Sequence, residues 1–330
     1  MNNNKIWRAL LAVCAVVLLA AVGMRFLPFA HAEQYNVGDA EISASIKNLE
    51  INWTSGRVQI DYHSGNTILI SEKTTGVISE SMRMRWRLDG DTLRIEYDKP
   101  GFHLFSFMPH DKELTVDLPD GLKLEKANIS VTSGDVSIPA LYADELKLAS
   151  TSGDIRGSVC ARTVKGQLTS GNMDLQIMSM AEEVSLESTS GSITLDAMEI
   201  EKKAVISTTS GDIRAAVKQT DEFKATSTSG DIHAVIGNAK QTAVGSTSGK
   251  VIADISTVHT LDIHTTSGGV TAYLPQTPGF TAQIETTSGR FESQLALTKQ
   301  GNAYIAGDGS GTVKFHTTSG NILLNAKEDK

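Results

Sequence analysis

Four carboxylates at equivalent places in a repeated sequence are the first candidates for metal chemistry. Asp135, Asp154, Asp212 and Asp231 each directly follow the glycine of a Thr-Ser-Gly tripeptide. Carboxylate oxygens are ligands that Ca²⁺ prefers, so stacked repeats could align them around an ion. The spacing does not match the glycine- and aspartate-rich calcium nonapeptide, and other repeats hold Asn172, Ser192, Lys250, Gly269 or Arg290 at this place. We therefore favour a polar turn over a calcium site, and the ion-binding alternative stays open.

A second candidate is a row of arginines. Arg83, Arg85 and Arg87 alternate with apolar residues, so a strand would place three guanidinium groups on one face. Such a face could bind phosphate or carboxylate polymers, for example anionic wall glycans. The alternative, which we favour, is a solvated face whose charges pair with Asp89, Asp91 or Glu96.

A proline-flanked segment, residues 100–109, is the most hydrophobic stretch after the N-terminal region. It contains Phe102, Phe105 and Phe107. The segment could touch a membrane surface or a partner. We favour a cap, because an array of stacked repeats needs one at its end.

Motifs for catalysis are missing from the sequence. It has no HExxH, no GxSxG, no phosphate-binding glycine loop before a helix and no paired CxxC. A polysaccharide hydrolase built on stacked strands would need clustered carboxylates with basic or aromatic partners, and here these residues are scattered. His264 and His316 share one outward position, which is a weak metal signal. We predict a protein that is not an enzyme and has no cofactor.

These residues are organised by the Thr-Ser-Gly repeat itself. The tripeptide occurs ten times between residues 132 and 320, and its glycines are 18 to 21 residues apart until a last step of 31. A fixed period near 20 residues is typical of a solenoid. The predicted corner glycines are Gly134, Gly153, Gly171, Gly191, Gly211, Gly230, Gly249, Gly268, Gly289 and Gly320.

Apolar residues alternate on both sides of each glycine, as in Leu261 and Ile263 before Gly268. Each repeat is therefore a strand, a corner and a second strand with one inward face. We predict an all-β protein, a single-stack parallel β-solenoid of about ten rungs of about 19 residues over residues 119–330. A smaller, irregular β region with a cap is expected over residues 33–118. Glycine at the corner is expected to supply the backbone angles of a sharp turn.

The N-terminal residues 1–32 predict export. Lys5 and Arg8 precede an uncharged apolar run, and Ala30-His31-Ala32 resembles a cleavage site. Cleavage near Ala32 would give a secreted or cell-surface protein, whereas anchoring through residues 6–29 would leave the chain on the membrane, facing outside. The other residues contain 27 basic and 38 acidic side chains, a net charge of −11, which disfavours nucleic acid as a partner. Only Cys160 follows the signal, so the mature part has no intramolecular disulfide.

The segment LTVDLPDGLKLEKANISVTSGDVSI, the repeated TSGDI and the final GDGSGTVKFHTTSGNILL resemble a bacterial family over residues 40–325. This is the "putative adhesin" family of β-strand-repeat proteins, catalogued as a domain of unknown function. The N-terminal segment also resembles LiaG-like membrane-anchored proteins of envelope-stress systems. The resemblance implies a surface-exposed β-solenoid that adheres or acts as a scaffold, with no assigned catalytic residues.

We therefore expect a non-enzymatic cell-envelope interaction protein whose partner is a wall or surface glycan or an envelope protein. An accessory of an envelope-stress response and a carbohydrate-active enzyme are the alternatives.

Overall fold

A computed structural model describes residues 35–98, 111–277 and 279–327. The chain divides into residues 1–35 and residues 36–330, and the second unit is described here. The predicted signal or anchor and the segment with Phe102, Phe105 and Phe107 lie outside the described residues. No helix in the described ranges is long and apolar enough to cross a membrane.

The second unit is built from strands, together with one short 3₁₀ helix, η1 (Glu80–Met82), among the described residues. Its first strands are β1 (Asn36–Val37), β2 (Ala40–Ile42), β3 (Asn48–His63), β4 (Ile68–Thr74), β5 (Arg85–Asp89), β6 (Thr92–Glu96) and β7 (Lys112–Pro119). The stacked repeats contain β8 (Leu124–Ser152), β9 (Ile155–Ser170), β10 (Met173–Ile177), β11 (Ala181–Ser190), β12 (Ile193–Thr208), β13 (Ile213–Ser227), β14 (Ile232–Ser246), β15 (Val251–Thr265) and β16 (Val270–Leu274). The last strands are β17 (Phe280–Thr286), β18 (Phe291–Ser293), β19 (Thr298–Gln300), β20 (Ala303–Ala306), β21 (Gly311–Thr317) and β22 (Ile322–Ala326).

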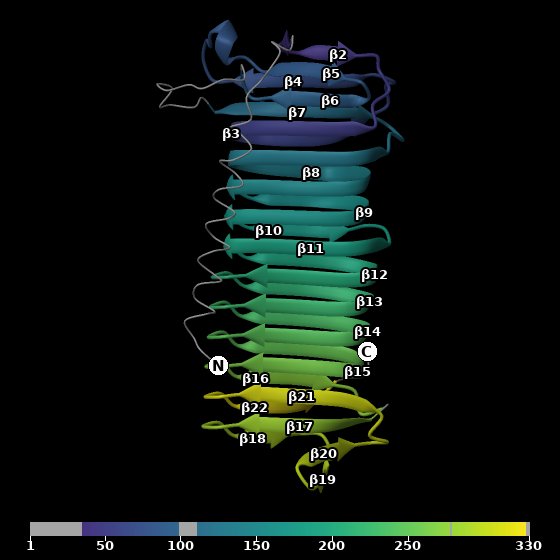
Figure 1. The fold of residues 1–330 in the computed structure, drawn as a ribbon, viewed down its shortest axis with the longest axis vertical. Coiled ribbons are helices and arrows are strands. Elements are labelled where there is room, and N and C mark those ends of the chain that lie inside the picture. The colour runs from purple at the N-terminus through teal and green to yellow at the C-terminus, as the bar shows by residue number, and fades with distance from the viewer. Residues whose placement is uncertain (1–34, 99–110, 278, 328–330) are drawn as a thin grey trace. The chain divides into compact units, whose positions relative to one another are not determined.

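Parallel, in-register stacking holds the repeats together. Ile213 of β13 pairs with Ile193 of β12 and with Ile232 of β14, and all three are fully buried. Every second residue of a strand points inward, so each rung adds its apolar side chains to those of the rungs beside it. Figure 1 shows these strands side by side from β8 to β15. The predicted all-β solenoid is confirmed.

The corner glycines stack on one another as closely as the backbone permits. A Cβ atom built on Gly211 would lie 2.0 Å from the carbonyl oxygen of Gly191, and the corresponding distances in the other rungs, beginning with Gly134 on Gly56, are 1.6–2.2 Å. Real Cβ atoms do not approach that near. The expected reason for glycine, an unusual backbone angle, holds at Gly153 and Gly171, whose φ angles are 117° and 112°, but is wrong at Gly211, whose φ lies outside the left-handed region. Close approach between neighbouring rungs excludes a side chain there.

The glycine column begins earlier than the repeat spacing indicates. Gly56 pairs with Gly134, and β3 runs parallel to β8 from Asn48 to Gln59. On its other side β3 pairs with β6 and β7, also in parallel. Pairing is thus continuous across residues 118 and 119, where the sequence spacing places a boundary.

At the other end the spatial order of the rungs differs from their order in the chain. β21 lies between β15 and β17, and β22 lies between β16 and β18 (Figure 1). A Cβ on Gly320 would therefore meet Gly268, and one on Gly289 would meet Gly320. The long last step of 31 residues accommodates β19 and β20, which pair antiparallel with each other and, through β20, with β17.

A buried ion pair lies where the first strands, β1–β7, meet the stacked repeats; these seven are the lead-in strands. The Lys112 Nζ lies 2.6 Å from Glu72 Oε1, and each side chain is 1% exposed. Lys112 also donates to the carbonyl oxygens of Met82 and Tyr97, and its Nζ is 3.8 Å from the centroid of the Tyr97 ring. Glu72 accepts the Met84 N–H through both carboxylate oxygens. Burial lowers the pKa of Lys112, and the hydrogen bond to Glu72 opposes that shift.

Replacing Gly211 with alanine tests the close approach. The new Cβ would collide with backbone atoms of Gly191 and Ser192, which cannot move without shifting the rung. We expect Gly211→Ala to lower the free energy of unfolding by about 3 kcal/mol or more in urea denaturation. Gly269→Ala is the matched control, because its Cβ would meet only the Asn321 oxygen at 3.4 Å. Equal losses in the two variants would contradict the stacking argument.

Removing one partner of the buried ion pair should be costly. Lys112→Met removes the buried counter-charge of Glu72 and leaves it Arg83, whose partly exposed guanidinium lies 3.7 Å away. We expect a loss of about 3–5 kcal/mol in the free energy of unfolding. The double variant Lys112→Met/Glu72→Gln removes the stranded charge and keeps an acceptor for the Met84 N–H, so it should recover part of this loss. If both variants unfold at the same urea concentration, the stranded charge is not the cause.

Candidate interaction surface

The Thr-Ser-Gly corners form one edge of the stack, and their hydroxyl groups face outward. All ten serines, among them Ser229 and Ser248, are exposed, and the threonines are exposed or half-buried. None of these twenty hydroxyl groups makes a hydrogen bond within the described residues. The side chains of the repeated Thr and Ser are therefore available to solvent or to a ligand.

In the later rungs, the hydroxyl that holds the corner belongs to the residue three positions before the glycine. Ser246 is 3% exposed, accepts the N–H of Gly249 at 2.9 Å and donates to the carbonyl oxygen of Gly230 at 3.0 Å. The same pair of bonds recurs in neighbouring rungs, through Thr208, Ser227, Thr265 and Thr286. Each such hydroxyl links its own corner to the preceding one.

Where the residue after the glycine carries a side-chain acceptor, it joins the rungs in a second way. Asp135 accepts the backbone N–H of Asp154 at 2.9 Å, and Asp212 accepts that of Asp231 at 3.0 Å. Asn172 and Ser192 do the same for the rungs that follow them. The four aspartates considered for calcium thus lie in one column, and Asp135, Asp154, Asp212 and Asp231 use carboxylate oxygens to accept N–H groups of the next rung. In the described part of the chain, no group of three or more His, Cys, Asp or Glu side chains converges as a metal site.

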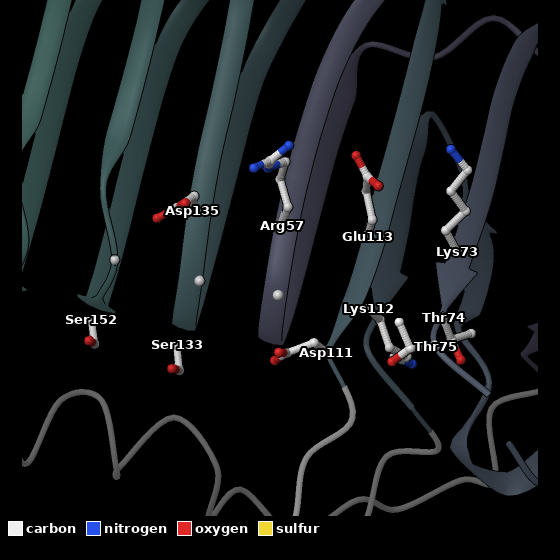
Figure 2. Close-up of a pocket in the computed structure, with 13 residues that line it drawn as sticks. Arg57, Lys73, Thr74, Thr75, Asp111, Lys112, Glu113, Ser133, Asp135 and Ser152 are labelled. Carbon is white, nitrogen blue, oxygen red and sulfur yellow. The ribbon is translucent and has the colours of Figure 1, made fainter. Parts of the chain in front are cut away.

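An open groove of about 700 Å³ lies along this edge, where the first rungs meet the lead-in strands. Its floor and rim come from β3, β4, β7, β8 and the corners at Gly56, Gly134 and Gly153. Hydroxyl groups of Thr74, Thr75, Ser133 and Ser152 line it together with charged side chains (Figure 2). The groove is therefore polar and begins the row of outward Thr-Ser hydroxyls.

Charges of alternating sign cross the groove. In the strand register, Lys73 lies opposite Glu113, Glu113 lies opposite Arg57, and Arg57 lies opposite Asp135. Figure 2 shows Arg57 between Asp135 and Glu113. Neighbouring strands are about 4.8 Å apart, so the two carboxylates flank one guanidinium. Within the described residues Arg57 is exposed and makes no ion pair, so its five N–H donors can reach a ligand.

This geometry suits binding better than acid–base catalysis. A glycosidase needs room for substrate or water between its two carboxylates, and one carboxyl group must stay protonated in a buried environment. Here Arg57 rises from the strand between Glu113 and Asp135, and the groove is open. Side chains of both signs can instead hold a polar ligand by hydrogen bonds and charge.

The predicted arginine row is only partly present. Arg83 does not lie on the strand, because residues 80–82 form η1 and β5 begins at Arg85. Its guanidinium lies 3.8 Å from Asp39 and 3.7 Å from Glu72. Arg85 donates to the Glu80 carbonyl oxygen, and Arg87 lies 3.8 Å from Asp89. The three side chains therefore do not form a single face, and their role as an interaction surface stays a prediction.

His264 and His316 are lateral partners, as the sequence pattern predicts. His316 also pairs with Glu285 on its other side, with 3.3 Å between Nδ1 and Oε2. Sequence reasoning missed the groove. The sequence feature that could have indicated it is Thr54-Ser55-Gly56, which has the sequence of the repeat but is separated from the next copy by far more than one period.

A pair of serine substitutions separates the structural hydroxyls from the outward ones. Ser246→Ala leaves the Gly249 N–H and the Gly230 carbonyl buried without this partner, and should lower the free energy of unfolding by about 1–3 kcal/mol. Ser248→Ala, two residues away and exposed, should change it by less than about 0.5 kcal/mol. Urea denaturation measures both. A large loss in Ser248→Ala would show that the repeated serine is structural.

Comparisons with known proteins give a family but no curated relative. The sequence matches none of the curated proteins searched. Among solved structures, the chain is similar to a protein of Bacteroides fragilis NCTC 9343 described as a putative adhesin, at 12% identity, 89% coverage of this chain, 98% of the other and a TM-score of 0.36. Two proteins of Parabacteroides distasonis ATCC 8503 are similar at 13% identity and a TM-score of 0.39. One is described as a putative adhesin, with 86% and 98% of the two chains covered, and the other as a putative lipid binding protein, with 90% and 98% covered.

The family match covers most of the stack. Residues 46–254 and 235–325 match the profile of the Toastrack DUF4097 domain, a domain of unknown function. The matched ranges contain β3, the groove strand β7 and all eleven glycines of the column. This chain belongs to the Toastrack DUF4097 family.

Proposed function

We propose that the protein is an exported, non-enzymatic interaction protein of the cell envelope, an adhesin or scaffold that binds through its corner edge. The observation that carries the proposal is the division between interior and edge. Apolar side chains fill the interior, whereas unbonded hydroxyls line one edge, and a row of charged side chains crosses an open groove beside it.

The groove indicates the kind of ligand. Lys73 and Arg57 alternate with Glu113 and Asp135, and serine and threonine hydroxyls continue the polar surface along the stack. A polymer that carries hydroxyl groups and charges of both signs, such as a wall glycan with its peptide, complements this surface. Flexible polar chains gain affinity from repeated contacts when the binding groups are regularly spaced.

The rigidity of the edge supports the same role. Between Gly191 and Gly249, each corner is tied to the next by a buried hydroxyl, by a side-chain acceptor after the glycine and by backbone pairing. Little conformational entropy is then lost when a long ligand binds, and this saving favours affinity. A scaffold or an adhesin needs such a preorganised surface and no moving parts.

Charge reversal in the groove tests the proposal. In pull-downs of the tagged full chain with purified wall material, we expect Arg57→Glu to weaken binding about tenfold or more. Arg290→Glu is the matched control, because Arg290 holds the same position after a corner glycine at the far end of the stack and is also exposed. Equal binding by Arg57→Glu and the unaltered chain would overturn the groove as the contact.

Fractionation of cells that produce the tagged chain tests the location. Recovery in the cytosol would overturn the envelope role, whereas recovery with membrane or outside the cell supports it. Release of soluble sugars from wall material would instead favour the enzyme alternative. Capture of an envelope-stress component with no wall binding would favour the accessory role.

A further inference from the structure

A row of sulfur-bearing side chains crosses three neighbouring rungs, away from the Thr-Ser-Gly edge. Val159 pairs with Ile177, and Ile177 pairs with Ala197. The residue that follows each of these is Cys160, Met178 or Met198. The Met178 N–H donates to the Val159 carbonyl oxygen at 2.9 Å, so the register continues beyond the end of β10. The three side chains are therefore lateral neighbours on strands about 4.8 Å apart.

These sulfur atoms lie on the outside of the protein. Met178 is 57% exposed and Met198 is 59% exposed, and Cys160 is a half-buried free thiol. Methionine usually fills gaps in a core, as Met84 and Met173 do here. Two adjacent methionines beside a thiol on a polar exterior are not explained by packing.

A local insertion brings a third thioether to the row. Val159 and Thr163 are four residues apart in the chain. Their partners on the neighbouring rung, Ile177 and Glu183, are six residues apart, so that rung contains two extra residues, which form a bulge. Met180 lies in the bulge and is 60% exposed. Residues 178–180 belong to no strand, and Met180 follows Met178 by two residues in this connection.

An ordered aromatic pair flanks the thiol. Tyr142 pairs with Cys160 on the preceding strand, and the Tyr142 ring meets Tyr62 edge to face, with 5.5 Å between centroids. The Tyr62 hydroxyl donates to the Leu122 carbonyl at 3.0 Å and accepts the Tyr142 N–H at 3.2 Å. Burial raises the pKa of Tyr62. Cys160 therefore has a rigid apolar wall on one side and thioethers on the other.

We propose that Cys160, Met178 and Met198 form a binding site for a soft monovalent metal ion of the Cu(I) class, with Met180 as an additional ligand. Thiolate and thioether sulfur atoms select Cu(I) over hard ions such as Ca²⁺ and Mg²⁺. Binding displaces the thiol proton of Cys160 to solvent, and the thioethers bind without a proton change. The site is independent of the groove and of the proposed adhesive role.

Metal titration of the full chain tests the site. Ag(I) serves as a redox-stable probe and Cu(I) is used under anaerobic conditions, both in a Cys14→Ser background so that Cys160 is the only thiol. We expect one ion per chain and a sulfur-only shell in Cu(I) X-ray absorption. Cys160→Ser, Met178→Leu and Met198→Leu should each weaken binding about tenfold or more. Thermal unfolding should change little, because Met178 and Met198 are exposed and Cys160 is only half-buried.

Met82→Leu is the matched control, because Met82 is half-buried in η1 and belongs to no sulfur row. Its affinity for Ag(I) should equal that of the reference. Binding that survives Cys160→Ser unchanged, or that falls equally in Met82→Leu, would overturn the proposal, as would nitrogen or oxygen ligands in the absorption spectrum.

Discussion

The closeness of successive glycines at one corner is the constraint on which the rest of the structure depends. A Cβ atom built on a corner glycine would lie only 1.6–2.2 Å from the carbonyl oxygen of the glycine in the adjacent rung. No other residue fits there, and every rung must therefore turn at the equivalent residue. Once the corner is fixed, the two strands beside it have only one register that keeps their apolar side chains inward. The buried hydroxyl of Ser246 then lies beside the Gly230 carbonyl oxygen of the preceding rung, and the Asp231 carboxylate lies beside the Lys250 N–H of the following one.

In-register stacking has a consequence for the exterior. Outward side chains at equivalent positions must form columns, so a change in one rung places a new group beside its neighbours. The charge row at Lys73, Glu113, Arg57 and Asp135 is one such arrangement, and the sulfur row is another. In both the proposed groove contact and the proposed metal site, binding depends on residues that vary between rungs, while the glycines that repeat hold the corner. The Thr and Ser of the tripeptide are the exception, since they repeat and yet face outward.

The sequence predicts the stack because its signals are local and repeated. In most rungs, as at Gly211, the corner glycine is followed by apolar residues two and four positions later, here Ile213 and Ala215. The alternation of apolar and polar residues then shows which side chains point inward. The lead-in could not be predicted as well, since Gly56 stands alone and its partner Gly134 is distant in the chain. Lys112 shows what was missed: it has the same parity as Leu114, Val116 and Leu118, so alternation places it inward with them. A charged residue at an inward position implies a buried partner, but nothing in the sequence identifies Glu72. The prediction that Arg83 shares a strand with Arg85 and Arg87 was wrong, because the 3₁₀ helix η1 ends directly before Arg83 and β5 begins at Arg85.

Parallel stacking has no intrinsic end, and the two ends of this stack are closed in a related way. At the start, β4 pairs antiparallel with β7, and β5 pairs antiparallel with β6. At the other end, β20 pairs antiparallel with β17, and β19 follows it with three exposed residues, Thr298, Lys299 and Gln300. A reversed strand presents a different hydrogen-bond pattern from the rungs, so another parallel rung cannot continue from it in register. An exposed, charged edge strand also resists pairing with other chains.

Inserting β21 and β22 between earlier rungs serves the same purpose, because the last Thr-Ser-Gly of the chain is then covered on both faces. The terminal rung is consequently that of β17 and β18, whose antiparallel partner β20 covers the strand edge at Phe280–Gln283, whereas the corner at Gly289 lies beyond the paired residues.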